Sequence, residues 1–222
     1  MITLLILLAE KGLLPDAIIR IGIKRLCRQR LVEASSSNQT IMEQEHSAWI
    51  DVLKESPIAL VPEKANEQHY EVPPRLFELV LGDRLKYSSG LWPEGVSSLD
   101  ESEVAMLKLT IQRAGLVDGQ DVLELGCGWG SLTLYMAECF PKSKITAVSN
   151  SNDQRQFIEE RCEERNLKNV EIITADMNDF ETAKLFDRVV SIEMFEHMRN
   201  YEKLLGRVNV WLKNKGKLFV HI

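Results

Sequence analysis

Cysteine is scarce in this sequence. The 222 residues include only Cys27, Cys127, Cys139 and Cys162, and no two of them form a Cys-x-x-Cys pair or a Cys/His spacing typical of a metal site. A secreted disulfide scaffold and a zinc module are therefore disfavoured. We interpret the cysteines as reduced thiols, and we expect a cytoplasmic protein that holds no metal ion.

The chain also lacks an excess of positive charge and a long hydrophobic run. Its formal net charge is −6. Binding to nucleic acid needs clustered cations that neutralise phosphates, so we expect no nucleic-acid partner. The apolar stretch from Met1 to Ala9 is far too short to span a bilayer, and it has neither the basic region nor the cleavage site of a secretory signal. We predict a short helix there, packed on the protein or touching a membrane surface.

Residues 1–65 predict an N-terminal helical arm. Residues 16–33 have the pattern of a basic amphipathic helix, whose cations are Arg20, Lys24, Arg25, Arg28 and Arg30. These cations face either solvent or the anionic headgroups of a membrane, so peripheral membrane contact stays open. Residues 33–44 are polar and rich in serine, which predicts a linker. Residues 45–60 are compatible with another short helix.

From residue 66 to residue 222 the pattern predicts an α/β domain. Two helices come first, at 75–81 and from Ser98 to Ala114; the second begins with the capping-box spacing of Ser98 and Glu101 and ends at Gly115. Hydrophobic strands then alternate with helices. The strands are expected at 121–125, 144–148, 169–174, 186–192 and 217–222, and the helices at 131–139, 153–165 and 201–212. This alternation indicates a mostly parallel sheet flanked by helices.

A glycine-rich turn joins the first strand of this domain to the next helix. Gly126, Gly128 and Gly130 allow a tight bend and a close approach of a ligand to the backbone, and the helix that follows points free amide groups at the ligand. Glu124, at the end of the strand, can receive polar groups of the ligand. A dinucleotide-binding fold has the spacing G-x-G-x-x-G and an acidic residue after its second strand. Here the spacing is G-x-G-x-G and the second strand ends in Ser149-Asn150-Ser151, which disfavours a dehydrogenase.

An acid–histidine cluster follows the fourth predicted strand, where open α/β sheets place their reacting groups. Glu193, Glu196 and His197 share one face if this segment is helical, and Tyr201 comes shortly after them. Histidine titrates near neutral pH and a neighbouring carboxylate can orient it, so the cluster could take a proton from an amine and attract a cationic substrate. The alternative is an exposed helix start with acids near its positive end.

The segment LELGCGWGSLTLYMA, followed by AVSNSNDQ and SIEMFEHMRNY, resembles the cyclopropane-fatty-acid synthase superfamily of class I methyltransferases. The resemblance covers residues 66–222. Three further segments (NVEIITADM, FEHMRNYE and LFVHI) are most similar to its coclaurine N-methyltransferase branch. The resemblance implies a Rossmann-like methyltransferase fold, S-adenosyl-L-methionine as the cofactor, and transfer of a methyl group to a small-molecule amine.

The resemblance also implies the residues of the site. Tyr87 and Ser88 would contact the methionine end of the cofactor. The full cofactor set is Tyr87, Ser88, Glu124, Gly126, Cys127, Gly128, Gly130, Ser149, Asn150, Gln154, Asp176, Met177 and Asn178. Glu193, Glu196 and His197 match the E-x-x-E-H segment that serves the amine in the N-methyltransferases, so we expect them to be catalytic.

Two alternatives stay open. In the lipid-modifying branch a bicarbonate ion acts as the base, and Glu196 and His221 match the residues that hold it, although Ser89 replaces a cysteine of that branch. The substrate would then be an unsaturated acyl chain. The family fold also continues beyond its fifth strand, so we expect the C-terminal strands to be missing here. A catalytically impaired cofactor-binding fragment is the second alternative. The oligomeric state does not follow from the sequence.

Overall fold

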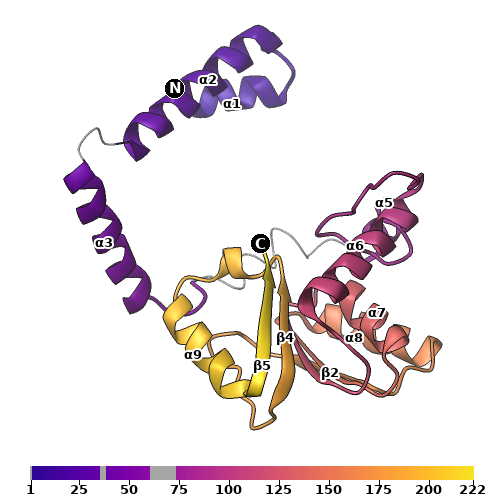
Figure 1. Ribbon diagram of the computed structural model, residues 1–222. Helices are drawn as coiled ribbons and strands as arrows, with labels where there is room; N and C mark the ends of the chain where they lie inside the picture. The colour runs from indigo at the N-terminus through magenta and orange to yellow at the C-terminus, as the bar shows by residue number, and fades with distance from the viewer. Residues whose placement is uncertain (1, 36–38, 61–73) are drawn as a thin grey trace. The chain divides into compact units, whose positions relative to one another are not determined.

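The computed structural model describes residues 2–35, 39–60 and 74–222 (Figure 1). They belong to two compact units, residues 1–52 and residues 53–222. The division lies earlier than the boundary that we expected after residue 65, and that boundary itself falls outside the described residues. Residues 53–60, expected in the arm, therefore belong to the larger unit.

The first unit is helical, as predicted. It contains α1 (Ile2–Glu10), α2 (Asp16–Ala34) and most of α3 (Gln39–Glu55). The linker expected over residues 33–44 is wrong from Gln39 onward, where α3 begins; the run from Gln39 to Glu55 contains no glycine or proline that would interrupt a helix. In the parts of the chain that the structure describes, no helix is both long and apolar enough to cross a membrane.

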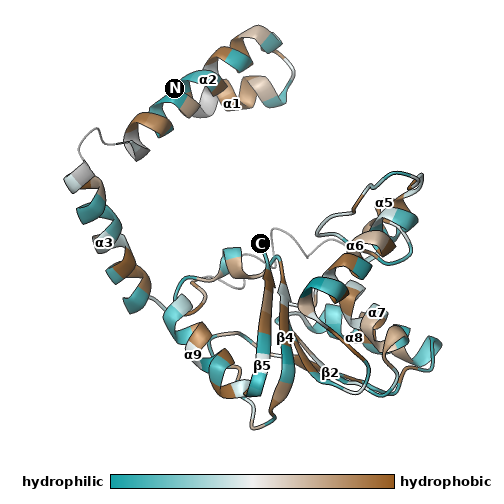
Figure 2. Ribbon diagram, viewed as in Figure 1, coloured by the Kyte–Doolittle hydropathy of each residue, from teal (hydrophilic) through white to brown (hydrophobic). Residues whose placement is uncertain are grey.

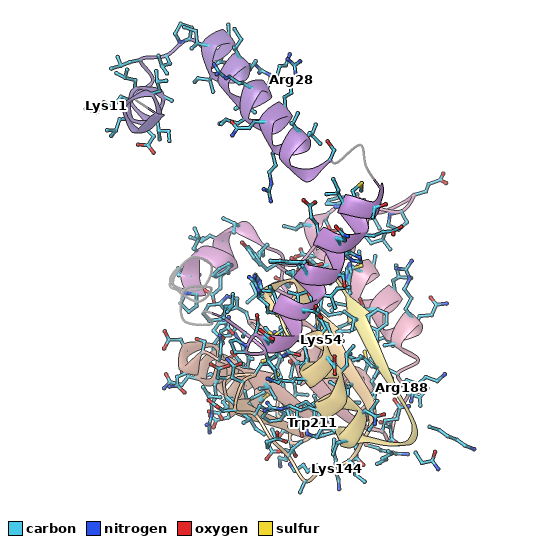
Figure 3. All side chains as sticks on the ribbon, turned by 90° about the vertical axis from the view of Figure 1, so that its left-hand side faces the viewer. Lys11, Arg28, Lys54, Lys144, Arg188 and Trp211 are labelled. Atoms are coloured by element: carbon cyan, nitrogen blue, oxygen red, sulfur yellow. The ribbon has the colours of Figure 1, made fainter. Side chains whose placement is uncertain are left out.

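Hydrophilic and hydrophobic residues are mixed along α2 (Figure 2), and most of them are exposed. Arg28, labelled in Figure 3, extends from the helix, and the other predicted cations of α2 are exposed too. Exposed apolar residues lie among them, including Ile18, Ile21, Leu26 and Val32.

The second unit is built around a five-stranded sheet. Its strands are β1 (Asp121–Leu125), β2 (Lys144–Ser149), β3 (Val170–Thr174), β4 (Phe186–Ile192) and β5 (Leu212–His221). The order is β3-β2-β1-β4-β5, and every neighbouring pair is parallel, which confirms the predicted sheet. Leu125 pairs with both Val148 and Ser191, so the carboxyl ends of β1, β2 and β4 meet at one edge.

Helices cover both faces of this sheet (Figure 1). On one face lie α6 (Leu99–Ala114), α7 (Ser131–Cys139) and α8 (Asn152–Glu164); α9 (Tyr201–Trp211) lies on the other. Trp211, labelled in Figure 3, is almost fully buried. Its ring packs edge to face against that of Phe180, with 5.1 Å between the ring centroids. The central strands β1 and β2 are mostly buried and hydrophobic because both faces of the sheet are covered, whereas β5 at the edge carries several hydrophilic residues (Figure 2).

Helix α6 and the short helix α5 (Pro74–Val80) frame a loop that leads to the site. The predicted capping box of α6 is present, because Ser98 and Glu101 exchange hydrogen bonds between side chain and backbone. Glu103 on α6 is fully buried, and its carboxylate accepts the N–H groups of Gly82 at 2.9 Å and Arg84 at 3.0 Å. A carboxylate that satisfies two buried amide groups fixes the loop that continues into residues 85–88.

Candidate functional site

A cavity of about 750 Å³ opens at the carboxyl edge of the sheet. Its lining comes from the loop at residues 85–88, the turn after β1, the end of β2, and the segments that follow β3 and β4. It includes most of the residues predicted from the sequence, namely Tyr87, Ser88, Glu124, Gly126, Cys127, Gly128, Ser149, Asn150, Gln154, Asp176, Met177, Glu193, Glu196 and His197. The parallel sheet thus brings segments that are far apart in the chain to one place.

The glycine-rich turn after β1 is built from left-handed backbone. Gly126, Gly128 and Gly130 have φ of 79°, 54° and 80°, which side-chain-bearing residues rarely adopt. A Cβ on Gly126 would lie 2.8 Å from the Cβ of Met194, whereas a Cβ on Gly128 would meet no atom within 4 Å. Gly128 also lines the cavity, so its open side is free for a ligand.

Two predicted cofactor residues lie outside the cavity lining. A Cβ on Gly130 would lie 2.7 Å from Cγ1 of Ile158, so Gly130 allows α7 and α8 to pack closely. Asn178 is bonded to Ala59: its Oδ1 accepts the Ala59 N–H at 3.1 Å, and its Nδ2 donates to the Ala59 carbonyl at 2.9 Å. This tether holds residues 58–60 on the larger unit, where Ala59 and Leu60 line the cavity.

Ser149 and Gln154 form a polar pair after β2. The Ser149 hydroxyl donates to Oε1 of Gln154 at 2.6 Å and accepts the Ser151 N–H at 3.0 Å. Gln154 is only 3% exposed, and within residues 2–35, 39–60 and 74–222 its Nε2 has no hydrogen-bond partner. A buried amide donor that lines a cavity is suited to bonding a ligand hydroxyl or carbonyl.

Asp176 and Met177 stand at the end of β3. The carboxylate of Asp176 accepts the N–H of Asn178 at 2.8 Å, which closes a tight turn. Met177 is buried and packs into the core beneath the cavity. The turn therefore presents Asp176 beside the Ser149–Gln154 pair on the cavity wall.

Glu193 follows β4 in an unusual conformation. Its φ of 51° is left-handed, which is strained for a glutamate. Its N–H donates to the His221 carbonyl on β5 at 2.9 Å, and its Oε1 lies 3.7 Å from Nε2 of His221. Neighbouring β5 thus holds Glu193 in this conformation.

Glu196 and His197 lie on the short 3₁₀ turn η1 (Phe195–His197). Glu193 precedes this turn, so the three residues do not share one helical face as the spacing had suggested, yet all three line the cavity. Tyr201 is outside the lining; its hydroxyl donates to the Phe195 carbonyl at 3.0 Å and thereby supports the turn.

Two carboxyl groups of the cavity hold their protons more tightly than free glutamates do. Burial raises the pKa of Glu196, and the hydrogen-bonded Glu193 raises it further, because two adjacent carboxylates repel each other. Burial also raises the pKa of Glu124 to about 7, against the opposing effects of Lys86 and of the Thr133 hydroxyl, which donates to Glu124 at 2.5 Å. Glu124 can therefore change protonation near neutral pH.

Lys86 is a site residue that our sequence reasoning missed. It is 5% exposed, lines the cavity, and donates from Nζ to Oγ of Ser88 at 2.6 Å. Burial lowers its pKa, against the opposing charges of Glu193, Glu103 and Glu124. Its position beside Tyr87 and Ser88 was the only signal in the sequence, and no local pattern marks a lysine as buried.

Known proteins resemble both the sequence and the fold. Residues 61–222 match the family described as mycolic acid cyclopropane synthetase. (S)-Coclaurine N-methyltransferase of Thalictrum flavum subsp. glaucum is 39% identical over 95% of this chain and 58% of its own length. Cyclopropane-fatty-acyl-phospholipid synthase of Escherichia coli (strain K12) is 34% identical over 70% of the chain and 39% of its own length.

Among solved structures, coclaurine N-methyltransferase bound to N-methylheliamine and SAH superposes with a TM-score of 0.88 at 39% identity. The match covers 99% of this chain and 64% of that protein. The chain therefore spans roughly 60% of the length of the coclaurine N-methyltransferases that it matches, and the expected Rossmann-like fold is confirmed.

Proposed function

This chain belongs to the mycolic acid cyclopropane synthetase family, and from that membership we propose that it transfers a methyl group from S-adenosyl-L-methionine to a small-molecule amine. One observation carries the proposal: the glycine-rich turn and the Glu193–Glu196–His197 cluster line the same cavity. A cofactor held by the turn and an acceptor held by the cluster would share that cavity. Proximity of this kind is a large part of the catalysis of a two-substrate reaction.

The residues of the cavity fit the cofactor. Gly128 leaves open space beside the backbone, and the buried Nε2 of Gln154 can bond a ribose hydroxyl. Asp176 and Met177 would stand on the adenine side, and Tyr87, Ser88 and Glu124 at the methionine end. When bound, S-adenosylmethionine supplies an electrophilic methyl group on a sulfonium. The SAH in the solved structure of coclaurine N-methyltransferase supports this choice of cofactor, since S-adenosylhomocysteine is what remains after methyl transfer.

The acid–histidine cluster would prepare the amine. A simple amine is protonated at neutral pH, so its lone pair must be freed before attack. The Glu193–Glu196 pair attracts the ammonium form, and His197 accepts its proton at a ring nitrogen. The names of the relatives that are N-methyltransferases support an amine acceptor.

A lipid alkene is the second candidate acceptor, because His221 lies beside Glu193 and a lipid-modifying synthase is among the relatives. Here Nε2 of His221 approaches Glu193 rather than Glu196, and His221 is outside the cavity lining. The lipid alternative would suit peripheral membrane contact through the exposed cations and apolar side chains of α2. In either case we propose a cytoplasmic protein, in keeping with its four cysteines, all of which are free thiols.

Two measurements test the proposal. Calorimetric titration with S-adenosylhomocysteine should show binding, and methyl-labelled S-adenosylmethionine should transfer label to a panel of secondary amines. Vesicles of unsaturated phospholipid, assayed in parallel, distinguish the lipid alternative. If lipid is labelled and no amine is, the acceptor is a lipid alkene instead of an amine. The absence of binding at millimolar cofactor would overturn the proposal.

A further inference from the structure

The charged residues of the cavity lining are mostly acidic. Of the described residues that line it, Lys86 alone is a lysine or arginine. Four acidic residues share the lining, namely Glu124, Asp176, Glu193 and Glu196. An anionic group of a ligand would be repelled by the ionised carboxylates and attracted by Lys86.

The Lys86 side chain has a fixed place. The loop that carries it is held by Glu103, whose buried carboxylate accepts two backbone N–H groups of residues 82–84. Leu85, next to Lys86, has a left-handed φ of 49°, and its N–H donates to the Gly82 carbonyl at 2.9 Å. An ammonium group has three donors, and the bond to Ser88 uses one of them. Lys86 is thus a preorganised donor rather than a flexible surface lysine.

Glu124 gives the same region an opposite charge. It is the last residue but one of β1, two positions before Gly126, and it lines the same cavity as Lys86, whose charge acts on it. The amino-acid end of S-adenosylmethionine is a zwitterion with one carboxylate and one ammonium. A fixed lysine near a fixed glutamate is complementary to that pair of charges.

Resting on the proposed function, we propose that Lys86 binds the carboxylate at the amino-acid end of the cofactor. It thereby selects nucleosides that carry this group. The competing explanation is structural: Lys86 would only neutralise Glu103, Glu124 and Glu193, and would contribute equally to the binding of every ligand.

The test compares two ligands that differ by the carboxylate alone, S-adenosylhomocysteine and its decarboxylated form, S-adenosyl-3-thiopropylamine. Dissociation constants are measured by calorimetry for the unmodified chain and for Lys86→Met. The unmodified chain should bind the decarboxylated ligand roughly 10- to 100-fold more weakly, the range expected for one hydrogen bond to a charged group. Lys86→Met should weaken the binding of S-adenosylhomocysteine by a similar factor and change the affinity for the decarboxylated ligand by less than about threefold.

Lys168→Met is the matched control, since Lys168 is exposed and outside the cavity lining, and it should change neither affinity. If thermal unfolding shows that Lys86→Met does not fold, Lys86→Gln takes its place, with the same expected loss of discrimination. The role of Lys86 would be overturned if the variant bound both ligands equally more weakly, or if it still discriminated between them. It would also be overturned if the unmodified chain bound both ligands with the same affinity. If the unmodified chain binds neither ligand, the proposed function itself fails.

Discussion

Two adjoining segments of the cavity lining are built by different means. The turn after β1 is made of backbone: three glycines with positive φ bend the chain and leave open space beside Gly128. The segment after β4 is made of side chains, and Glu193 adopts a left-handed conformation without being a glycine. Glycine reaches this conformation at little cost, whereas a glutamate is strained in it. The left-handed region is thus reached by glycines after β1 and by a side-chain-bearing residue after β4, where it costs strain.

A substitution in the segment after β4 should have the largest effect on activity. We expect His197→Ala to lower turnover by roughly 10²- to 10⁴-fold, the usual contribution of a general base, and to leave the affinity for S-adenosylhomocysteine nearly unchanged. Labelled-methyl transfer and calorimetry measure the two quantities. His46→Ala, an exposed histidine of the first unit, is the control. A parallel loss of cofactor affinity in His197→Ala would show that the turn after β1 and the segment after β4 are not separate in function.

Glu124, just before the glycine-rich turn after β1, should make stability depend on pH. Its folded pKa of about 7 lies above the ordinary value of 4.5, so between these values the folded state binds more protons than the unfolded state. Stability should therefore fall as pH rises through this window, by up to about 3 kcal/mol from this group. Urea unfolding at several pH values measures the slope. Glu124→Gln should flatten it, and an unchanged slope in that variant would contradict the assignment.

Two glycines of the turn should respond differently to the same substitution. Gly130→Ala places a Cβ against Ile158 in a left-handed conformation and should cost about 2 kcal/mol of unfolding free energy. Gly128→Ala has room for its Cβ, so it should cost only about 1 kcal/mol while weakening cofactor binding. Urea unfolding and S-adenosylhomocysteine titration separate the effects. Equal losses of stability at the two positions would refute the distinction between packing and ligand space.

The smallest effect concerns the strain at Glu193. Asparagine tolerates the left-handed region better than glutamine does, so Glu193→Asn should be more stable than Glu193→Gln by about 0.5–1 kcal/mol. Both variants remove the charge, so the loss of charge does not contribute to the difference between them. Equal midpoints of urea unfolding in the two variants would mean that the backbone at Glu193 is not strained.

Much of the fold follows from local pattern. Alternating strands and helices predicted the parallel sheet, and the capping box of Ser98 and Glu101 and the stop at Gly115 are present as expected. The beginning of β5 was not predicted: it starts at Leu212, directly after α9, and Lys213 pairs there with Asp187 on the adjacent strand β4 and with Asp121 on β1. Residues 39–44 of the expected linker likewise lie in α3, because polar residues without glycine or proline are compatible with a helix as well as with a loop.

The sequence by itself determined the order of strands and helices, the bend at the three glycines, and the side chains that the strand ends would carry, because these depend on neighbouring residues. Only the tertiary structure decided that Lys86 is buried among carboxylates, that Gly130 and Asn178 contact Ile158 and Ala59 respectively, and that His221 approaches Glu193. Those features join residues far apart in the chain. Burial, charge interaction and close packing exist only after the sheet has brought such residues together.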